Sequence, residues 1–309
     1  MGYKCVVCIK QVPDTKRITG QAMNEDGTVN RAALPAIFNP EDLNALEAAL
    51  QIREKYGGHV TVMTMGAPSA CGQLRDALVR GADDVLLLTD RRFAVADTLA
   101  TSYALAQAIE KRCGGYDIVL CGRQAIDGDT AQVGPQTAEK LGIPQIAFVQ
   151  EIQDISNGRI RAKRMIESGY EVVEAPLPVL LTVTNECNEP RPPRAKLLLQ
   201  FKRASGVSEI AARLRREVEG RGETPDPAAM QAQAEREAQE LEKRRLRLVE
   251  WNVDDLGADP ARCGKRGSPT KVKKIEAVVL KTGELKMIEP NEEGVRGLIR
   301  ELADKHILD

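Results

Sequence analysis

Five apolar runs alternate with amphipathic stretches along the first half of the chain. Short apolar runs of this kind predict strands, and apolar residues at helical spacing predict the helices between them. Strands that alternate with helices form parallel sheets, so the order predicts an α/β fold: an open parallel sheet with helices on both faces. The predicted strands are Lys4–Ile9, His59–Met65, Val85–Leu88, Asp117–Cys121 and Gln145–Val149, and the predicted helices are Pro40–Lys55, Ser69–Arg80, Asp97–Lys111 and Thr130–Leu141.

The pattern changes after residue 153, where apolar and polar positions alternate. Alternation is typical of strands with one solvated face, and glycines at 158 and 169 are suited to turns. We therefore expect antiparallel strands at Arg159–Ile166, Tyr170–Glu174 and Val179–Val183.

Beyond Arg203 the chain becomes rich in arginine, glutamate, alanine and glutamine. Thr224–Pro227 divides residues 206–247 into two helical stretches, and the second, Ala229–Arg247, carries dense charge pairs at helical spacing. This segment is either a solvated helical insertion or a docking helix for a partner.

A last helix is predicted at Asn291–Ile307, with Val295 and Ile299 among the apolar residues on one face. We divide the chain into an α/β domain (1–203), a charged helical insertion (204–250) and a helical C-terminal arm (251–309).

The composition is that of a globular protein, with 42% hydrophobic and 29% charged residues. The formal net charge of −1 gives no general attraction to nucleic acid. No apolar run approaches the roughly 20 residues that span a bilayer, and residues 1–10 lack the marks of a signal peptide. We expect a cytoplasmic protein without a transmembrane segment.

The seven cysteines are dispersed, which suggests free thiols. Cys5 and Cys8 match a CxxC motif but lie within a predicted strand. Residues three apart on a strand point to opposite faces, so we expect no shared metal. His59 and His306 are the only histidines, so neither a histidine-based triad nor a zinc site is expected.

The most informative polar segment is the loop Gly122–Gly134, which follows the fourth predicted strand and leads into a helix. Ligands of doubly wound sheets bind at the carboxyl ends of strands. Glycines let the backbone approach phosphate oxygens, and a helix N-terminus offers free N–H groups and a positive dipole end. We interpret this loop as a phosphate grip of an adenine-containing cofactor; the alternative is a polar loop with ordinary helix capping.

Standard nucleotide fingerprints are missing. No GxGxxG follows a predicted strand, and no GxxxxGK[ST] is present. The segment Gly267–Lys271 is only loosely similar to a P-loop and follows no predicted strand.

Several motifs, in this order, resemble those of the beta subunit of electron transfer flavoproteins. The resemblance covers residues 1 to about 200 and resumes near Val249. It rests on Cys8–Asp14, Asn39–Asp42, Gly122–Gly134, Asn188–Arg191 and Gly267–Val272.

The resemblance implies an adenine-nucleotide α-hydrolase-like fold and a heterodimer with an FAD-carrying alpha subunit. Ordinary members hold a structural AMP, whereas the electron-bifurcating branch holds a second FAD to which NADH delivers a hydride. The implied pocket is Cys8, Asn39, Asp42, Met65, Gly66, Cys121, Gly122, Gln124, Gly128, Asp129, Thr130, Ala131, Gln132, Val133 and Gly134.

The stretch from Asp90 to Ser102 is similar to the bifurcating branch, in which Asp97, Thr98 and Thr101 would line a flavin pocket. The alternative is that Asp97 and Thr98 only cap a helix. Val95 stands where the branch usually has glycine. Because a β-branched residue disfavours positive φ, we expect valine to narrow the approach to the flavin or to prevent the left-handed conformation.

The family's partner-recognition loop corresponds to residues 188–200. The resemblance assigns Glu189, Arg191, Ala195 and Leu197 to recognition of an acyl-CoA dehydrogenase-type or other redox partner. Ala195 lies at or near the position of the family's anchoring leucine, which indicates a different partner.

The leading interpretation is therefore an electron carrier subunit without an acid–base catalyst, whose flavin supplies the redox chemistry. The alternative is a non-redox adenine-nucleotide-binding module or an ATP-cleaving enzyme of the same fold class. Such enzymes need a glycine-rich pyrophosphate loop after the first strand, where Lys10–Asp14 contains no glycine.

Overall fold

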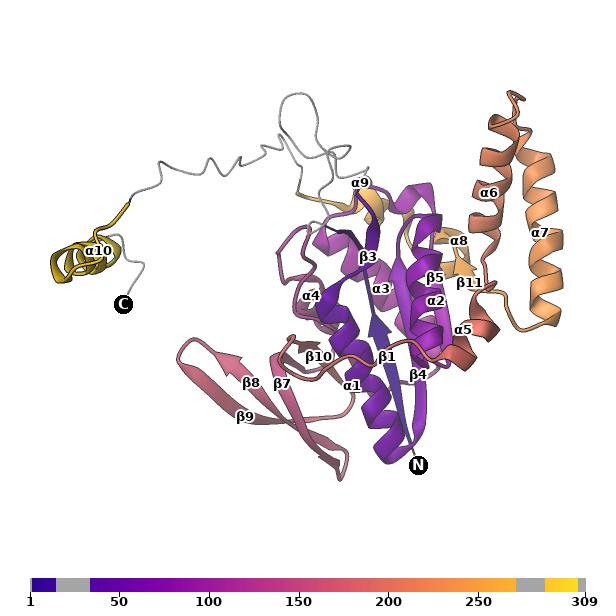
Figure 1. Ribbon diagram of the computed structural model, residues 1–309. Helices are drawn as coiled ribbons and strands as arrows, with labels where there is room; N and C mark the ends of the chain where they lie inside the picture. The colour runs from indigo at the N-terminus through magenta and orange to yellow at the C-terminus, as the bar shows by residue number, and fades with distance from the viewer. Residues whose placement is uncertain (1, 15–33, 271–286, 305–309) are drawn as a thin grey trace.

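The computed structural model describes residues 2–14, 34–270 and 287–304. Its centre is a nine-stranded sheet in the order β11-β5-β4-β1-β6-β10-β7-β8-β9 (Figure 1). The strands from β11 to β7 pair in parallel, and β7, β8 and β9 pair antiparallel. Their bounds are β1 Tyr3–Cys8, β4 Gly58–Met65, β5 Asp84–Leu88, β6 Ile118–Gly122, β7 Gln145–Ser156, β8 Arg159–Ile166, β9 Gly169–Pro176, β10 Val179–Val183 and β11 Val249–Trp251.

Helices cover both faces of the parallel part of the sheet, which confirms the predicted α/β class. The helices α1 (Pro40–Tyr56) and α2 (Cys71–Arg80) pack on one face through a large apolar cluster. The helices α3 (Thr98–Cys113) and α4 (Val133–Leu141) pack on the other through a second cluster.

The first strand shows how the two clusters are separated. Cys5 belongs to the α1 side and Cys8 to the α3 side, as expected for residues three apart on a strand. All seven cysteines are free.

Two strand predictions need correction. Val179–Val183 is not antiparallel: it inserts between β6 and β7 and pairs with both in parallel. All five of its residues are buried, so its run is that of a strand covered on both faces. The strand predicted at Gln145–Val149 continues to Ser156, because its second half pairs with β8 beyond the helical layer.

Residues 207–243 form a helical hairpin, α6 (Val207–Glu219) and α7 (Pro227–Lys243), beside the β11 end of the sheet (Figure 1). The predicted break is confirmed: Asp226 caps α7 and Pro227 begins it. The second helix ends at Lys243, earlier than the predicted Arg247. The hairpin has its own small core of Ile210, Leu214, Ala234 and Ala238.

The remaining elements are short or lie near the C-terminus. β2 (Gln11–Pro13) and β3 (Ala36–Phe38) form a two-stranded antiparallel sheet. The predicted helix Asn291–Ile307 is found as α10 at Glu292–Asp304, and residues 305–307 lie outside the described part. Among the described helices, none is both long and apolar enough to cross a membrane. The other elements are η3 Pro68–Ala70, η4 Arg91–Phe93, α5 Ala195–Phe201, α8 Val253–Leu256, η5 Pro260–Arg262 and α9 Gly264–Gly267.

Candidate functional site

The carboxyl ends of β1 and β6 mark the point where the strand order reverses. From β1 the chain proceeds to β4 and β5 on one side, and then returns to β6 on the other. Ligands of open α/β sheets bind in the crevice at such a point. The loop Gly122–Gly134 starts there.

Asp42, near the start of α1, ties the two strand ends together. Its Oδ2 accepts the N–H of Lys10 at 2.8 Å, and its Oδ1 accepts the N–H of Gly122 at 2.8 Å. Burial raises the pKa of this carboxyl to about 7, against the lowering effect of these hydrogen bonds. Because both oxygens are used by backbone donors, the side chain braces the site from within.

Asn39 braces the loop itself. Its fully buried side chain donates to the carbonyl of Gln124 at 2.9 Å and accepts the N–H of Ile126 at 3.1 Å. On the outer side, Lys10 Nζ lies 2.7 Å from Asp127 Oδ1. The first half of the loop is therefore held by side chains from two other segments.

The second half of the loop is open to solvent. Gly128, Asp129, Thr130 and Gln132 are exposed. Asp129 and Ala131 have φ of 48° and 53°, so they take left-handed conformations without being glycine.

Helix α4 begins at Val133, three residues later than predicted, because these left-handed residues precede it. A left-handed residue followed by the helical Gln132 turns successive N–H groups to one side, as in anion-binding nests. No side chain caps this described helix, so its positive end is available to a phosphate.

The start of α3 faces the same loop. The Thr98 hydroxyl lies 3.0 Å from Gln132 Oε1, and Thr101, one turn along, is half-buried. Asp97 caps α3 through the N–H of Ala100 at 3.0 Å. Although burial raises it, hydrogen bonds from backbone N–H groups hold the pKa of Asp97 below its usual value. The structure thus places Thr98 beside the predicted phosphate loop.

Four further predicted residues lie at the ends of the strands. Cys8 and Cys121 are buried on the α3 side, and burial raises the pKa of both thiols. Met65 and Gly66, at the end of β4, are half-buried. The two cysteines are therefore enclosed by the core, whereas Met65 and Gly66 are partly accessible at the strand end.

Comparisons with known proteins show the family of this chain. A family model described as "Electron transfer flavoprotein domain" matches residues 26–206, more than half of the chain. The electron transfer flavoprotein subunit beta of Clostridium acetobutylicum is 40% identical over 304 residues, covering 98% of this chain and 99% of the relative. The chain belongs to the family of electron transfer flavoprotein beta subunits.

Two other relatives carry names of larger complexes. The caffeyl-CoA reductase-Etf complex subunit CarD of Acetobacterium woodii is 38% identical, with 99% of this chain and all of the relative covered. The acryloyl-CoA reductase electron transfer subunit gamma of Anaerotignum propionicum is 48% identical over 187 residues, covering 60% of this chain and 69% of that relative. The alignment with CarD spans nearly the whole of both chains, so this flavoprotein subunit and CarD are of similar length. The charged hairpin is therefore not an addition peculiar to this chain.

Residues 188–200 of this electron transfer flavoprotein subunit, the segment predicted to recognise the partner, contact α1 through Arg191. Arg191 lies 2.7 Å from the buried carboxylate of Glu47 and also pairs with Glu54. Glu189 and Ala195 are exposed, and Leu197 is half-buried. Arg191 therefore fixes the loop to α1, whereas the other three residues lie nearer the surface.

Sequence reasoning missed the two most exposed leucines of α5. Leu198 and Leu199 are 49% and 70% exposed. Consecutive leucines in a seven-residue helix cannot all face inward, and this signal was available in the run from Leu197 to Leu199.

Val95 overturns one expectation. Its φ is 59°, so valine does not prevent the left-handed conformation at this position. Its side chain is 75% exposed. A β-branched residue with positive φ is a strained outlier, which indicates that the neighbouring structure holds it there.

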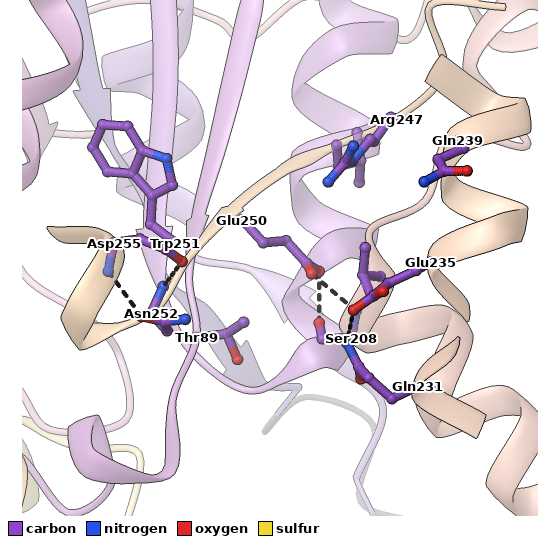
Figure 2. Close-up of a pocket in the computed structure, with 12 residues that line it drawn as sticks. Thr89, Ser208, Gln231, Glu235, Gln239, Arg247, Glu250, Trp251, Asn252 and Asp255 are labelled. Atoms are coloured by element: carbon purple, nitrogen blue, oxygen red, sulfur yellow. Dashed lines mark hydrogen bonds between the residues drawn. The ribbon is translucent and has the colours of Figure 1, made fainter. Parts of the chain in front are cut away.

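A cavity of about 410 Å³ lies elsewhere, between the hairpin and β11. Figure 2 shows Glu250 pointing toward Ser208, whose hydroxyl donates to Glu250 Oε1 at 2.6 Å. No residue of the loop Gly122–Gly134 lines this cavity. It is therefore separate from the candidate nucleotide site of the flavoprotein subunit.

Proposed function

We propose that the chain is the beta subunit of a heterodimeric electron transfer flavoprotein and binds FAD beside the loop Gly122–Gly134. The observation that carries this proposal is the uncapped start of α4, preceded by left-handed Asp129 and Ala131 and facing Thr98. Backbone N–H groups and a helix dipole at this point fit a phosphate group.

The protein's own part is to bind and orient. Residues 131–134 would hold phosphate, Thr98 and Thr101 would contact the remainder of the cofactor, and Asp42 and Asn39 would keep the loop in shape. A bound flavin would supply hydride and electron transfer. We propose that electrons pass from NADH or a dehydrogenase to an acyl-CoA dehydrogenase- or quinone-type partner in the cytoplasm.

The ligand beside this loop decides whether the subunit takes part in electron bifurcation, which needs a second FAD at this place. The names of the caffeyl-CoA and acryloyl-CoA reductase relatives and the position of Thr98 support a second flavin that accepts a hydride from NADH. AMP in the same pocket is the alternative and would make the subunit an ordinary carrier.

The cofactor content tests this proposal. We expect the chain, purified with its co-expressed alpha subunit and then denatured, to release two FAD per heterodimer. One FAD with one AMP would contradict bifurcation. Release of adenine nucleotide without any flavin would contradict the flavoprotein function altogether.

We also propose that Leu198 and Leu199 contact the redox partner. Exposed apolar side chains on the short helix α5, which follows the segment fixed by Arg191, are suited to bury area in a partner's groove. Leu199→Ala should weaken partner-dependent electron transfer about tenfold, the effect of about 1.4 kcal/mol of lost contact. The measurement compares turnover with the partner and with a small dye acceptor.

Gln200→Ala is the matched control, because Gln200 is an exposed polar neighbour on the same helix. It should leave both rates unchanged. Equal losses with the partner and with the dye for Leu199→Ala would show a defect in the subunit itself, contrary to the proposed contact.

Described residues 287–304 provide a further apolar surface. Val295 and Ile299 of α10 are 48% and 52% exposed. We propose that this part of the C-terminal arm docks on the alpha subunit, since such a helix face needs cover.

A further inference from the structure

The loop that joins β5 to α3, residues 89–97, lies against a later segment of the chain. We call residues 253–270 the strap. At one end of the contact, the N–H of Val253 donates to Asp90 Oδ2 at 3.2 Å. Contacts with the strap recur along the loop as far as Asp97.

In the middle of this contact the two backbones nearly touch. Gly264 has φ of 51°, and a Cβ on it would lie 2.1 Å from the carbonyl oxygen of Arg92. The next strap residue, Lys265, donates its N–H to the carbonyl of Ala94 at 3.0 Å. Only glycine allows this approach.

Ser268 makes the contact at the far end of the loop. This residue is only 7% exposed. Its hydroxyl donates to the carbonyl of Gly264 at 2.7 Å and accepts the N–H of Asp97 at 2.8 Å. The N–H of Thr270 donates to Asp97 Oδ2 at 3.1 Å. The strap therefore holds both the backbone and the carboxylate of Asp97.

Val95 lies between the attachments at Ala94 and Asp97. Its left-handed backbone is unfavourable for a β-branched residue, and its exposed side chain gains little burial to compensate. The restraint that keeps this turn in place must come from its flanks, which are the residues held by the strap.

Two residues, Asp97 and Thr98, connect the strap to the loop Gly122–Gly134. Asp97 caps α3, and the adjacent Thr98 contacts Gln132. A shift of Asp97 would therefore move the Thr98 hydroxyl relative to the start of α4.

We propose that Ser268 is a positioning residue for the nucleotide site: its hydroxyl keeps the Val95 turn left-handed and so places Thr98 beside Gln132. This inference rests on the proposed nucleotide-binding function. Ser268 touches no ligand itself and acts through Asp97.

The test measures the rate at which the heterodimer releases FAD or AMP from the beta subunit. Ser268→Ala should release nucleotide about tenfold faster, the effect of losing one buried hydrogen bond. Ser268→Thr, which keeps the hydroxyl, should restore slow release. Ser208→Ala is the control: it removes another hydrogen-bonded hydroxyl, which donates to Glu250 Oε1 in the separate cavity beside the hairpin, and should leave release unchanged.

A double-mutant cycle separates positioning from general stability. Glycine takes positive φ freely, so in a Val95→Gly background Ser268→Ala should accelerate release less than threefold. The same tenfold acceleration in both backgrounds would overturn the proposal, because the hydroxyl would then act independently of the strained turn.

Amide hydrogen exchange on the nucleotide-free chain distinguishes failure of this inference from failure of the proposed function. The Asp97 amide should lose protection in Ser268→Ala and keep it in Ser268→Thr. If the wild-type heterodimer holds no nucleotide but the amide behaves this way, the strap contact stands and the proposed function fails. Unchanged protection in Ser268→Ala would overturn the positioning role.

Discussion

Gly122→Ala is expected to destabilise the protein by about 3 kcal/mol and to abolish nucleotide retention. A Cβ at this position would lie 2.6 Å from Asp42 Oδ1 and 2.8 Å from both the nitrogen of Asp42 and the carbonyl carbon of Glu41. Two of these three atoms belong to the backbone of α1, which cannot rotate aside. The helix would have to move away from the end of β6, breaking the Asp42 hydrogen bond to the Gly122 N–H.

Gly128→Ala is the matched control within the same loop. A Cβ there meets no atom within 4 Å, and the residue has no positive φ. Urea unfolding of both variants tests the difference in stability, and the nucleotide content of Gly122→Ala is compared with that of the wild type. Similar effects of the two substitutions would contradict the close packing of β6 against α1.

The local elements of the fold could be predicted from the sequence, but the order of the strands could not. Strands such as β4 and helices such as α1 were predictable because apolar spacing is a local property. The place of Val179–Val183 between β6 and β7 was not, since the order of strands in a sheet depends on pairing between distant segments. The local pattern therefore led to a prediction of antiparallel pairing for Val179–Val183, whereas the strand pairs in parallel.

The loop Gly122–Gly134 shows the same limit at the level of single residues. The chain order predicted that the loop lies between β6 and α4, and its glycines and polar residues predicted a binding loop. That Asp42 and Asn39 bind backbone groups of the loop depends on which side of it each lies, which only the three-dimensional structure shows. The left-handed Ala131 carried no sequence signal, and Asp129 carried only a weak one, since aspartate takes this conformation more often than most residues other than glycine.

The buried carboxyl of Asp42 should make stability fall as pH rises from about 4 to 7. Its pKa is about 7 in the folded protein and 3.8 for an unperturbed aspartate, because burial disfavours the charged form. In this window the folded state binds more protons than the unfolded state, so each rise in pH favours unfolding. At 1.36 kcal/mol per unit of pKa, the contribution of Asp42 should decline by an amount on the order of 4 kcal/mol.

Asp42→Asn isolates this contribution, because asparagine has nearly the same shape and does not titrate. Its amide cannot accept both the Lys10 and the Gly122 N–H groups, so it should lower stability by some constant amount. The measurement is the unfolding free energy of the wild type minus that of Asp42→Asn at each pH. This difference should fall between pH 4 and 7 and be constant above pH 7. Carbon-13 NMR of the Asp42 carboxyl should show a midpoint near pH 7. A midpoint below pH 5, or a stability difference independent of pH, would mean that the two backbone donors outweigh burial and keep the carboxylate ionised.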